Sequence, residues 1–220
     1  MKHLTLLILI LLTPLQVVCN PVTIWKGDPQ SNKVALTFDD GPKPGESNRI
    51  LNILDKYGVR ATFFVIGTKS LEHPDLIYRI HSSGHDLANH SYSHTNLTTL
   101  PYEEILKELS DTNKILEKAS IGPIRYFRPP GGKYNKDVLN VVKELKLNMI
   151  MWEVNSGDYA TRLSKEHDPI DKSVLEKTTG GSIILLHNGG EKTIQALPKI
   201  ITGLQRRGYQ LVPLRDMLPL

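Results

Sequence analysis

The stretch Val34-Ala35-Leu36-Thr37-Phe38-Asp39-Asp40-Gly41-Pro42 joins an apolar run, typical of a buried strand, directly to two adjacent carboxylates. Neighbouring side chains on a regular strand point to opposite faces, so Asp39 and Asp40 could not serve one site if the strand continued. Gly41 permits backbone angles that other residues avoid, and Pro42 removes a donor from the strand ladder. We therefore expect the chain to turn after the apolar run, so that both carboxylates converge at its tip. The alternative is an ordinary Asp-Gly-Pro turn with a solvated aspartate.

Outward from this stretch, short apolar runs alternate with segments of helical period, which indicates βα units and a mainly parallel sheet. Seven strands and six helices in one chain of 220 residues, 40% of them hydrophobic, predict a single α/β domain built as a barrel. The predicted strands are Val34–Phe38, Ala61–Ile66, Asp86–Asn89, Tyr126–Arg128, Met149–Trp152, Ser182–Leu186 and Gln210–Val212. The predicted helices are Ser47–Tyr57, Pro74–Ser82, Tyr102–Lys118, Lys136–Lys146, Asp171–Thr178 and Thr193–Arg207.

A pair of imidazoles lies further along the chain, in His90-Ser91-Tyr92-Ser93-His94. Residues at i and i+4 share one face of a helical turn, so we expect His90 and His94 to reach a single ion. With Asp40 they form a set of two histidines and one carboxylate, which leaves coordination positions open. Open positions indicate catalysis, because structural zinc is usually closed by four protein ligands. The same set could hold non-haem iron, so the ligands do not fix the metal.

Five motifs in this order resemble those of the polysaccharide deacetylases with a NodB-homology domain, carbohydrate esterase family 4. They are Thr37–Pro42, His90–His94, Arg128-Pro129-Pro130, Asp158 and Leu185-Leu186-His187-Asn188. The resemblance runs from about Lys33 to Leu214 and implies a distorted (β/α)7 or (β/α)8 barrel. Each motif follows a predicted strand, at the rim where barrels of alternating strands and helices carry their sites.

The resemblance also implies roles for individual residues. Asp40, His90 and His94 would hold a divalent metal, with zinc the first candidate, and a metal-bound water would be the nucleophile. Asp39 would be the general base, and His187 the general acid that protonates the departing nitrogen. Read without its motif, His187 could equally be an ordinary core histidine.

Two further residues would support this pair of acid and base. Arg128 would hold Asp39 ionised and oriented, and Asp158 would raise the pKa of His187. The alternative reading of Arg128 and Asp158 is an ordinary salt bridge each.

The chain departs from the family's pattern at two positions that face the substrate. Gly131 replaces the usual tyrosine after Pro130, where the family binds the oxyanion with a backbone amide that glycine can still donate. Tyr159 replaces the usual tryptophan after the fourth-motif aspartate, which leaves a smaller apolar face. Trp152 matches a family aromatic. We thus expect Pro130, Gly131, Tyr159 and Trp152 to line the oxyanion and substrate region, with substrate preference in doubt.

The amino terminus predicts export. Residues 1–19 have the layout of a secretory signal peptide, with an apolar stretch too short to span a bilayer. Residues 20–32 would be a lead-in, and 33–220 the NodB-homology domain. Cys19 is the only cysteine, so cleavage after it leaves no thiol; lipid anchoring at Cys19 is the alternative.

A net charge of +4 without a basic run gives no support for nucleic-acid binding, and we expect a monomer without stable membrane insertion.

Three functions remain open. The first is a metal-dependent hydrolase that removes N-acetyl groups from N-acetylglucosamine residues of peptidoglycan or a chitin-like oligosaccharide. The second is an O-acetyl esterase acting on xylan or a similar polysaccharide. The third is a catalytically silent carbohydrate-binding protein, which would have lost a base, a ligand or an acid, whereas this sequence keeps all of them.

Overall fold

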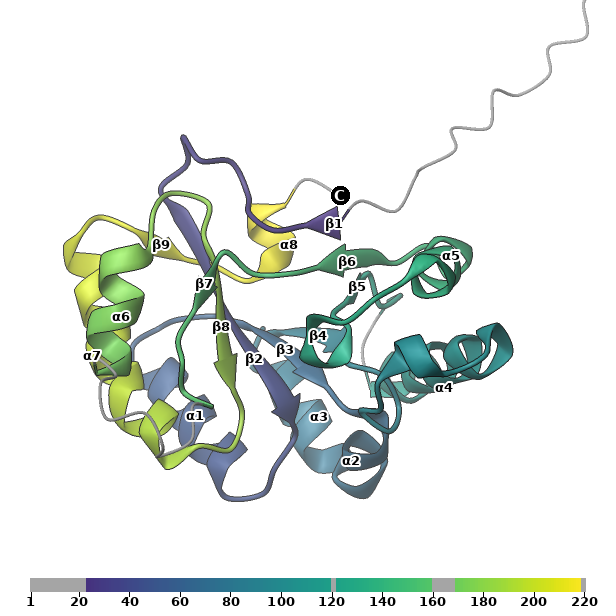
Figure 1. Cartoon of the computed structure of the whole chain (residues 1–220). Coiled ribbons are helices and arrows are strands. Elements are labelled where there is room, and N and C mark those ends of the chain that lie inside the picture. The colour runs from purple at the N-terminus through teal and green to yellow at the C-terminus, as the bar shows by residue number, and fades with distance from the viewer. Residues whose placement is uncertain (1–22, 120–121, 160–168, 219–220) are drawn as a thin grey trace, which may run out of the picture.

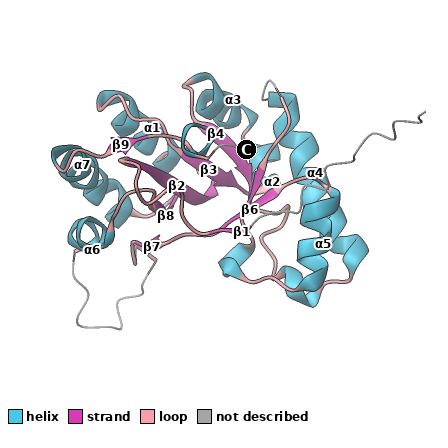
Figure 2. Ribbon diagram, turned by 90° about the horizontal axis from the view of Figure 1, so that it is seen from above, coloured by secondary structure: helices cyan, strands magenta, loops and turns pink. Residues whose placement is uncertain are grey.

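A computed structural model describes residues 23–119, 122–159 and 169–218. Its central feature is a curled sheet of parallel strands, with helices packed around the outside (Figures 1 and 2). The strands are β1 (Thr23–Ile24), β2 (Lys33–Gly41), β3 (Thr62–Val65), β4 (Asp86–Asn89), β5 (Tyr126–Phe127), β6 (Asn148–Ile150), β7 (Val154–Asn155), β8 (Ile183–His187) and β9 (Gln210–Leu211). The helices are α1 (Glu46–Lys56), α2 (Gly67–Glu72), α3 (Pro74–Ser82), α4 (Tyr102–Ala119), α5 (Lys136–Glu144), α6 (Ile170–Lys177), α7 (Glu191–Arg206) and α8 (Leu214–Met217), with 3₁₀ turns at Leu97–Thr99 and Pro130–Gly132.

The strand order is β1-β6-β5-β4-β3-β2-β8-β7, with β9 paired to the start of β2. Every one of these ladders is parallel. The sheet is an incompletely closed (β/α) barrel, which confirms the predicted fold class. The open seam is bridged by the chain itself, because β6 runs directly into β7 and Lys26 pairs with Ser182 just before β8.

Alternation along β2 separates two layers of core. Val34, Leu36 and Phe38 belong to the large cluster that packs the sheet against the helices. Ala35 belongs to a second cluster inside the barrel, together with Leu214 and Met217 of α8. The inward column of β2 therefore runs Ala35, Thr37, Asp39, as the period of two requires.

Helix α8 closes the amino-terminal end of the barrel. The backbone N–H of Leu214 donates to Thr62 Oγ1 at the start of β3, at 2.9 Å. The N–H of Arg215 donates to Asp86 Oδ2 at the start of β4, also at 2.9 Å. Because α8 covers the amino-terminal end of the barrel, a site can form only at the carboxyl-terminal rim.

All seven predicted strands and six predicted helices are present, with bounds shifted by a few residues. The strands β1 and β7 and the helices α2 and α8 were not predicted. The prediction of a helical turn at residues 90–94 was wrong, because Ser91 and His94 have φ of 62° and 60° and the segment is a loop. The predicted signal peptide lies outside the described residues. None of the helices within the described ranges has the length and apolar character needed to cross a bilayer.

Candidate metal centre and catalytic cleft

The two carboxylates of β2 converge by a different route from the predicted turn. The strand continues through Asp39 and Asp40 to Gly41, with an irregular register against β3 between Phe38 and Gly41. Asp40 has φ of 70°, a left-handed conformation that non-glycine residues adopt at a local cost. This break in the alternation turns Asp40 to the same side of the strand as Asp39.

Asp40 meets both imidazoles. Its Oδ1 lies 3.0 Å from His94 Nε2 and 3.4 Å from His90 Nε2. One ligand atom from each of the three residues lies within 4.8 Å of the others. Burial raises the pKa of Asp40, but the hydrogen bonds and charges of the two histidines outweigh it and hold that pKa well below its usual range. Two imidazole nitrogens and a carboxylate oxygen are a donor set that suits a divalent ion such as zinc.

The tautomer of His90 follows from its neighbours. His90 Nδ1 lies 2.7 Å from the carbonyl oxygen of Arg128, which can only accept. The proton of the neutral imidazole therefore sits on Nδ1, and Nε2 presents its lone pair toward Asp40. Backbone carbonyls orient metal-binding histidines in this way.

Helix α4 holds the loop between the two histidines. The carboxylate of Glu108 accepts from the backbone N–H of Tyr92 at 2.9 Å and of Ser93 at 2.8 Å, and from Ser93 Oγ at 2.7 Å. Ser91 Oγ accepts from the N–H of His94 at 3.0 Å. These bonds fix a loop whose left-handed residues would otherwise relax.

Arg128 is fully buried and binds Asp39 from behind. Its Nη1 donates to Asp39 Oδ1 at 2.7 Å and to Thr37 Oγ1 at 2.9 Å. Its Nε and Nη2 donate to the carbonyl oxygens of Ile150 and Met151, at 3.1 and 2.9 Å. Arg128 thereby ties β2 to the end of β6. The second oxygen of Asp39, Oδ2, lies 3.8 Å from His90 Nε2, one of the three candidate metal ligands.

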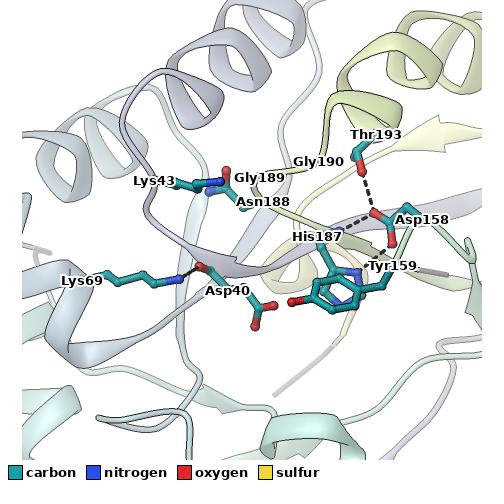
Figure 3. A pocket seen from close by; sticks show the side chains of 10 residues that line it. All are labelled: Asp40, Lys43, Lys69, Asp158, Tyr159, His187, Asn188, Gly189, Gly190 and Thr193. Carbon is teal, nitrogen blue, oxygen red and sulfur yellow. Dashed lines mark hydrogen bonds and ion pairs between the residues drawn. The ribbon is translucent and has the colours of Figure 1, made fainter. Parts of the chain in front are cut away.

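His187, at the end of β8, is oriented by Asp158. Asp158 Oδ1 lies 2.7 Å from His187 Nδ1, and its Oδ2 accepts from the N–H of His187 and from Thr193 Oγ1, each at 2.7 Å (Figure 3). Burial favours the neutral imidazole, but Asp158 outweighs it and raises the pKa of His187 above its ordinary value. Burial raises the pKa of Asp158, but its bonds to His187 and Thr193 outweigh that and lower it.

Eight of the eleven predicted site residues line one cavity of about 280 Å³, which is also lined by Gly132, Asn155 and Leu185. Gly131 lines it, and the backbone N–H of Gly131 has no hydrogen-bond partner among the described residues. The Trp152 ring lies against Gly132, where an added Cβ would meet it at 2.8 Å. Tyr159 is 71% exposed and lies on His187, with ring centroids 4.6 Å apart. Pro130 and Arg128 are buried and do not line this cavity, whereas Asp158 lines the adjoining one.

A second cavity of about 350 Å³ adjoins the first and shares Asp40, Tyr159 and His187 with it. Figure 3 shows Lys43 and Lys69 on one side of it and the Tyr159 and His187 rings on the other. Lys69 Nζ donates to the backbone carbonyl of Asp40 at 2.9 Å.

Sequence reasoning did not find Lys69, Glu108, Asn155 or Thr193. Thr193 had a weak signal, because a threonine near the start of a helix after Gly189-Gly190 is a common capping position. Lys69 and Glu108 had none. They act through contacts with residues 15 to 29 positions away, and one more lysine or glutamate on a helix has no mark of its own.

The chain is similar to known proteins over most of its length. Residues 26–150 match the family model described as polysaccharide deacetylase. The chain is 36% identical over 190 residues to the peptidoglycan-N-acetylmuramic acid deacetylase PdaC of Bacillus subtilis, covering 86% of this chain and 39% of PdaC. It is 33% identical over 199 residues to a chitooligosaccharide deacetylase of Azorhizobium caulinodans, covering 83% of this chain and 93% of the relative. The chain therefore spans about two fifths of PdaC and nearly all of the second relative.

Solved structures match across the barrel. A peptidoglycan N-acetylglucosamine deacetylase in complex with an N-hydroxybenzamide aligns with a TM-score of 0.83 and 32% identity, covering 90% of this chain and 93% of the other. A pseudoenzyme of carbohydrate esterase family 4 from Bacillus anthracis aligns with a TM-score of 0.81 and 32% identity, covering 90% and 69%. The same fold therefore occurs in a deacetylase and in a pseudoenzyme, so fold similarity alone does not establish activity. The side chains at the site carry that information.

Proposed function

Because this chain belongs to the polysaccharide deacetylase family, carbohydrate esterase family 4, we propose that it hydrolyses N-acetyl groups of an extracellular glycan in a metal-dependent reaction. The observation that carries the proposal is the meeting of Asp39, Asp40, His90, His94 and His187 around one cavity. The substrate would carry N-acetylglucosamine, in peptidoglycan or a chitin-like oligosaccharide. The domain would comprise residues 33–220, after a signal peptide and a lead-in.

The residues fit a catalytic metal. Asp40, His90 and His94 would hold a divalent ion, for which zinc is our first choice, and leave positions free for water and substrate. When bound, such an ion acidifies water and polarises the acetyl carbonyl. The groups around the ion would supply the general base, the general acid and the oxyanion donor.

Asp39 would take the proton from the attacking water. Arg128 binds Oδ1 and leaves Oδ2 toward the cavity, so the carboxylate is oriented with one oxygen free to accept. The backbone N–H of Gly131 would donate to the developing oxyanion, since Gly131 lines the cavity and this N–H has no other partner among the described residues.

His187 would protonate the departing nitrogen. Its Nδ1 is bonded to Asp158, so Nε2 is the nitrogen left for the substrate. Because Asp158 raises the pKa of His187, the imidazolium persists to higher pH, which suits an acid that must deliver a proton to an amine.

Acetate release tests the proposal. Zinc-loaded protein would be incubated in parallel with chitooligosaccharides, peptidoglycan and acetylated xylan. We expect acetate from at least one of the first two substrates, and its loss in His187→Ala. Release from xylan alone would favour the O-acetyl esterase, and release from none would leave the silent binding protein.

A further inference from the structure

The cavity beside the metal centre has an unbalanced charge on one wall. Of its carboxylates, Asp40 is engaged by His90 and His94, and Asp158 by His187 and Thr193. The two lysines stand opposite, as Figure 3 shows. The charge that is left for a ligand in this cavity is therefore positive.

Lys69 is the stronger of the two cations. It is partly buried, and among the described residues the only hydrogen bond of its ammonium group goes to the carbonyl oxygen of Asp40. An ammonium group has three donors, so two of them remain without a protein acceptor. No carboxylate lies within ion-pair distance of Lys69 in the described part of the chain. A partly desolvated ammonium gains most from an anionic acceptor, because charge-assisted hydrogen bonds are the stronger kind.

Lys43 lies over the loop after β8. A Cβ on Gly189 would lie 3.0 Å from Lys43 Cδ, so the glycine lets this side chain lie close to the loop. Its Nζ pairs with Glu46 Oε1 at 2.9 Å, but half of the Lys43 side chain is exposed. Exposed pairs contribute little, so Lys43 can turn toward a ligand at small cost.

The opposite wall suits a sugar ring. Tyr159 presents an exposed aromatic face on His187, and a cavity of about 350 Å³ is large enough for one substituted pyranose. The cavity shares Asp40, Tyr159 and His187 with the metal centre, so a group bound there belongs to the reacting sugar or its neighbour.

We propose that Lys69 and Lys43 form an anion subsite that selects glycans bearing a carboxylate close to the reacting acetamide. The inference rests on the proposed deacetylase function and narrows its substrate from neutral chitin-like chains to acidic ones. In peptidoglycan, two carboxylates could fill the subsite: the lactyl group of muramic acid in strands stripped of peptide, or a carboxylate of the stem peptide.

The test compares four glycans of equal length with the zinc-loaded protein: a neutral chitooligosaccharide, a peptide-free glycan with free lactyl groups, the same glycan with its lactyl groups methyl-esterified, and a peptide-bearing glycan. We expect kcat/KM to be at least about tenfold higher for a carboxylate-bearing glycan than for the neutral one. The esterified arm shows whether the lactyl group or the peptide supplies the charge.

The double variant Lys43→Met/Lys69→Met should reduce this preference about tenfold and weaken its dependence on salt. The double variant Lys118→Met/Lys143→Met removes the same two charges from exposed positions in the last turns of α4 and α5, outside both cavities, and is the matched control. Metal content is measured in each variant, because Lys69 also contacts Asp40.

Calorimetry that measures the affinity for the same glycans separates the proposed anion subsite from the proposed deacetylase function. Charge-selective binding that Lys43→Met/Lys69→Met loses would support the subsite even if no acetate were released, in which case only the proposed function fails. Equal affinity and turnover for neutral and acidic glycans, or a preference unchanged in Lys43→Met/Lys69→Met, would overturn the subsite.

Discussion

At the scale of single residues, the site depends on two adjacent aspartates with separate partners. Asp39 faces inward on the regular alternation of β2 and meets Arg128, whereas Asp40 reaches His90 and His94 only through a left-handed φ. The sequence was enough to predict that both aspartates belong to a site, because two adjacent carboxylates directly after a buried strand are unusual. The bulge that joins them could not be predicted, because a positive φ at aspartate has no signature in composition.

Replacing the proposed base should separate chemistry from metal binding. Asp39→Asn keeps the shape of the side chain and an oxygen for Arg128 but removes the proton acceptor. We expect kcat for acetate release to fall about 10²- to 10⁴-fold with zinc content unchanged. Steady-state kinetics and atomic absorption on the same preparation check this. Wild-type turnover in Asp39→Asn would exclude it as the base.

The pair of Asp158 and His187 predicts a pH effect. Asp158 raises the pKa of His187, and a general acid loses activity as the pH rises through its pKa. Asp158→Asn removes the negative charge, so the alkaline limb of the kcat profile should move to lower pH. At pH 7 and above, kcat should fall about tenfold or more. An alkaline limb that stays in place would show that His187 is not the proton donor.

Among the helices, α4 stabilises the loop of residues 90–94, which carries both histidines of the candidate metal site. The sequence places α4 correctly because its apolar residues repeat with helical period, and Ile105, Leu109 and Leu116 are fully buried. The sequence does not reveal that the Glu108 carboxylate binds the loop after β4. We had predicted a helical turn there, and a helical turn satisfies its own backbone N–H groups without a side chain from another helix.

Removing the hydrogen bonds between Glu108 and this loop should weaken metal binding. Glu108→Leu deletes three hydrogen bonds to residues 92–93, so His94 should lose its orientation and zinc affinity should fall about 10- to 100-fold. Glu108→Gln retains one acceptor oxygen for the two N–H groups and should recover most of the affinity. Competition with a chromophoric chelator measures both, and circular dichroism verifies the fold. Equal affinity in Glu108→Leu and wild type would mean that the loop is held by other contacts.

At the scale of the whole molecule, the barrel and its functional rim follow from the order of elements, while its closure does not. Alternating strands and helices predict parallel strands whose carboxyl ends share one edge, and the site residues do meet there. The two-residue strands β1 and β7 are too short for any periodicity to reveal. The seam they border is held by a network in which Lys26 Nζ bonds Glu153 and Thr179, at 2.6 and 2.7 Å.

We propose that Asp40, His90 and His94 hold one divalent ion on which deacetylation depends. Acetate release from chitooligosaccharides and peptidoglycan would be measured after removal of metal with a chelator and again during stepwise return of zinc. We expect stripped protein to be inactive, activity to return in full at one equivalent per chain, and Asp40→Ala not to recover at that stoichiometry. Undiminished acetate release by metal-free protein would contradict this proposal.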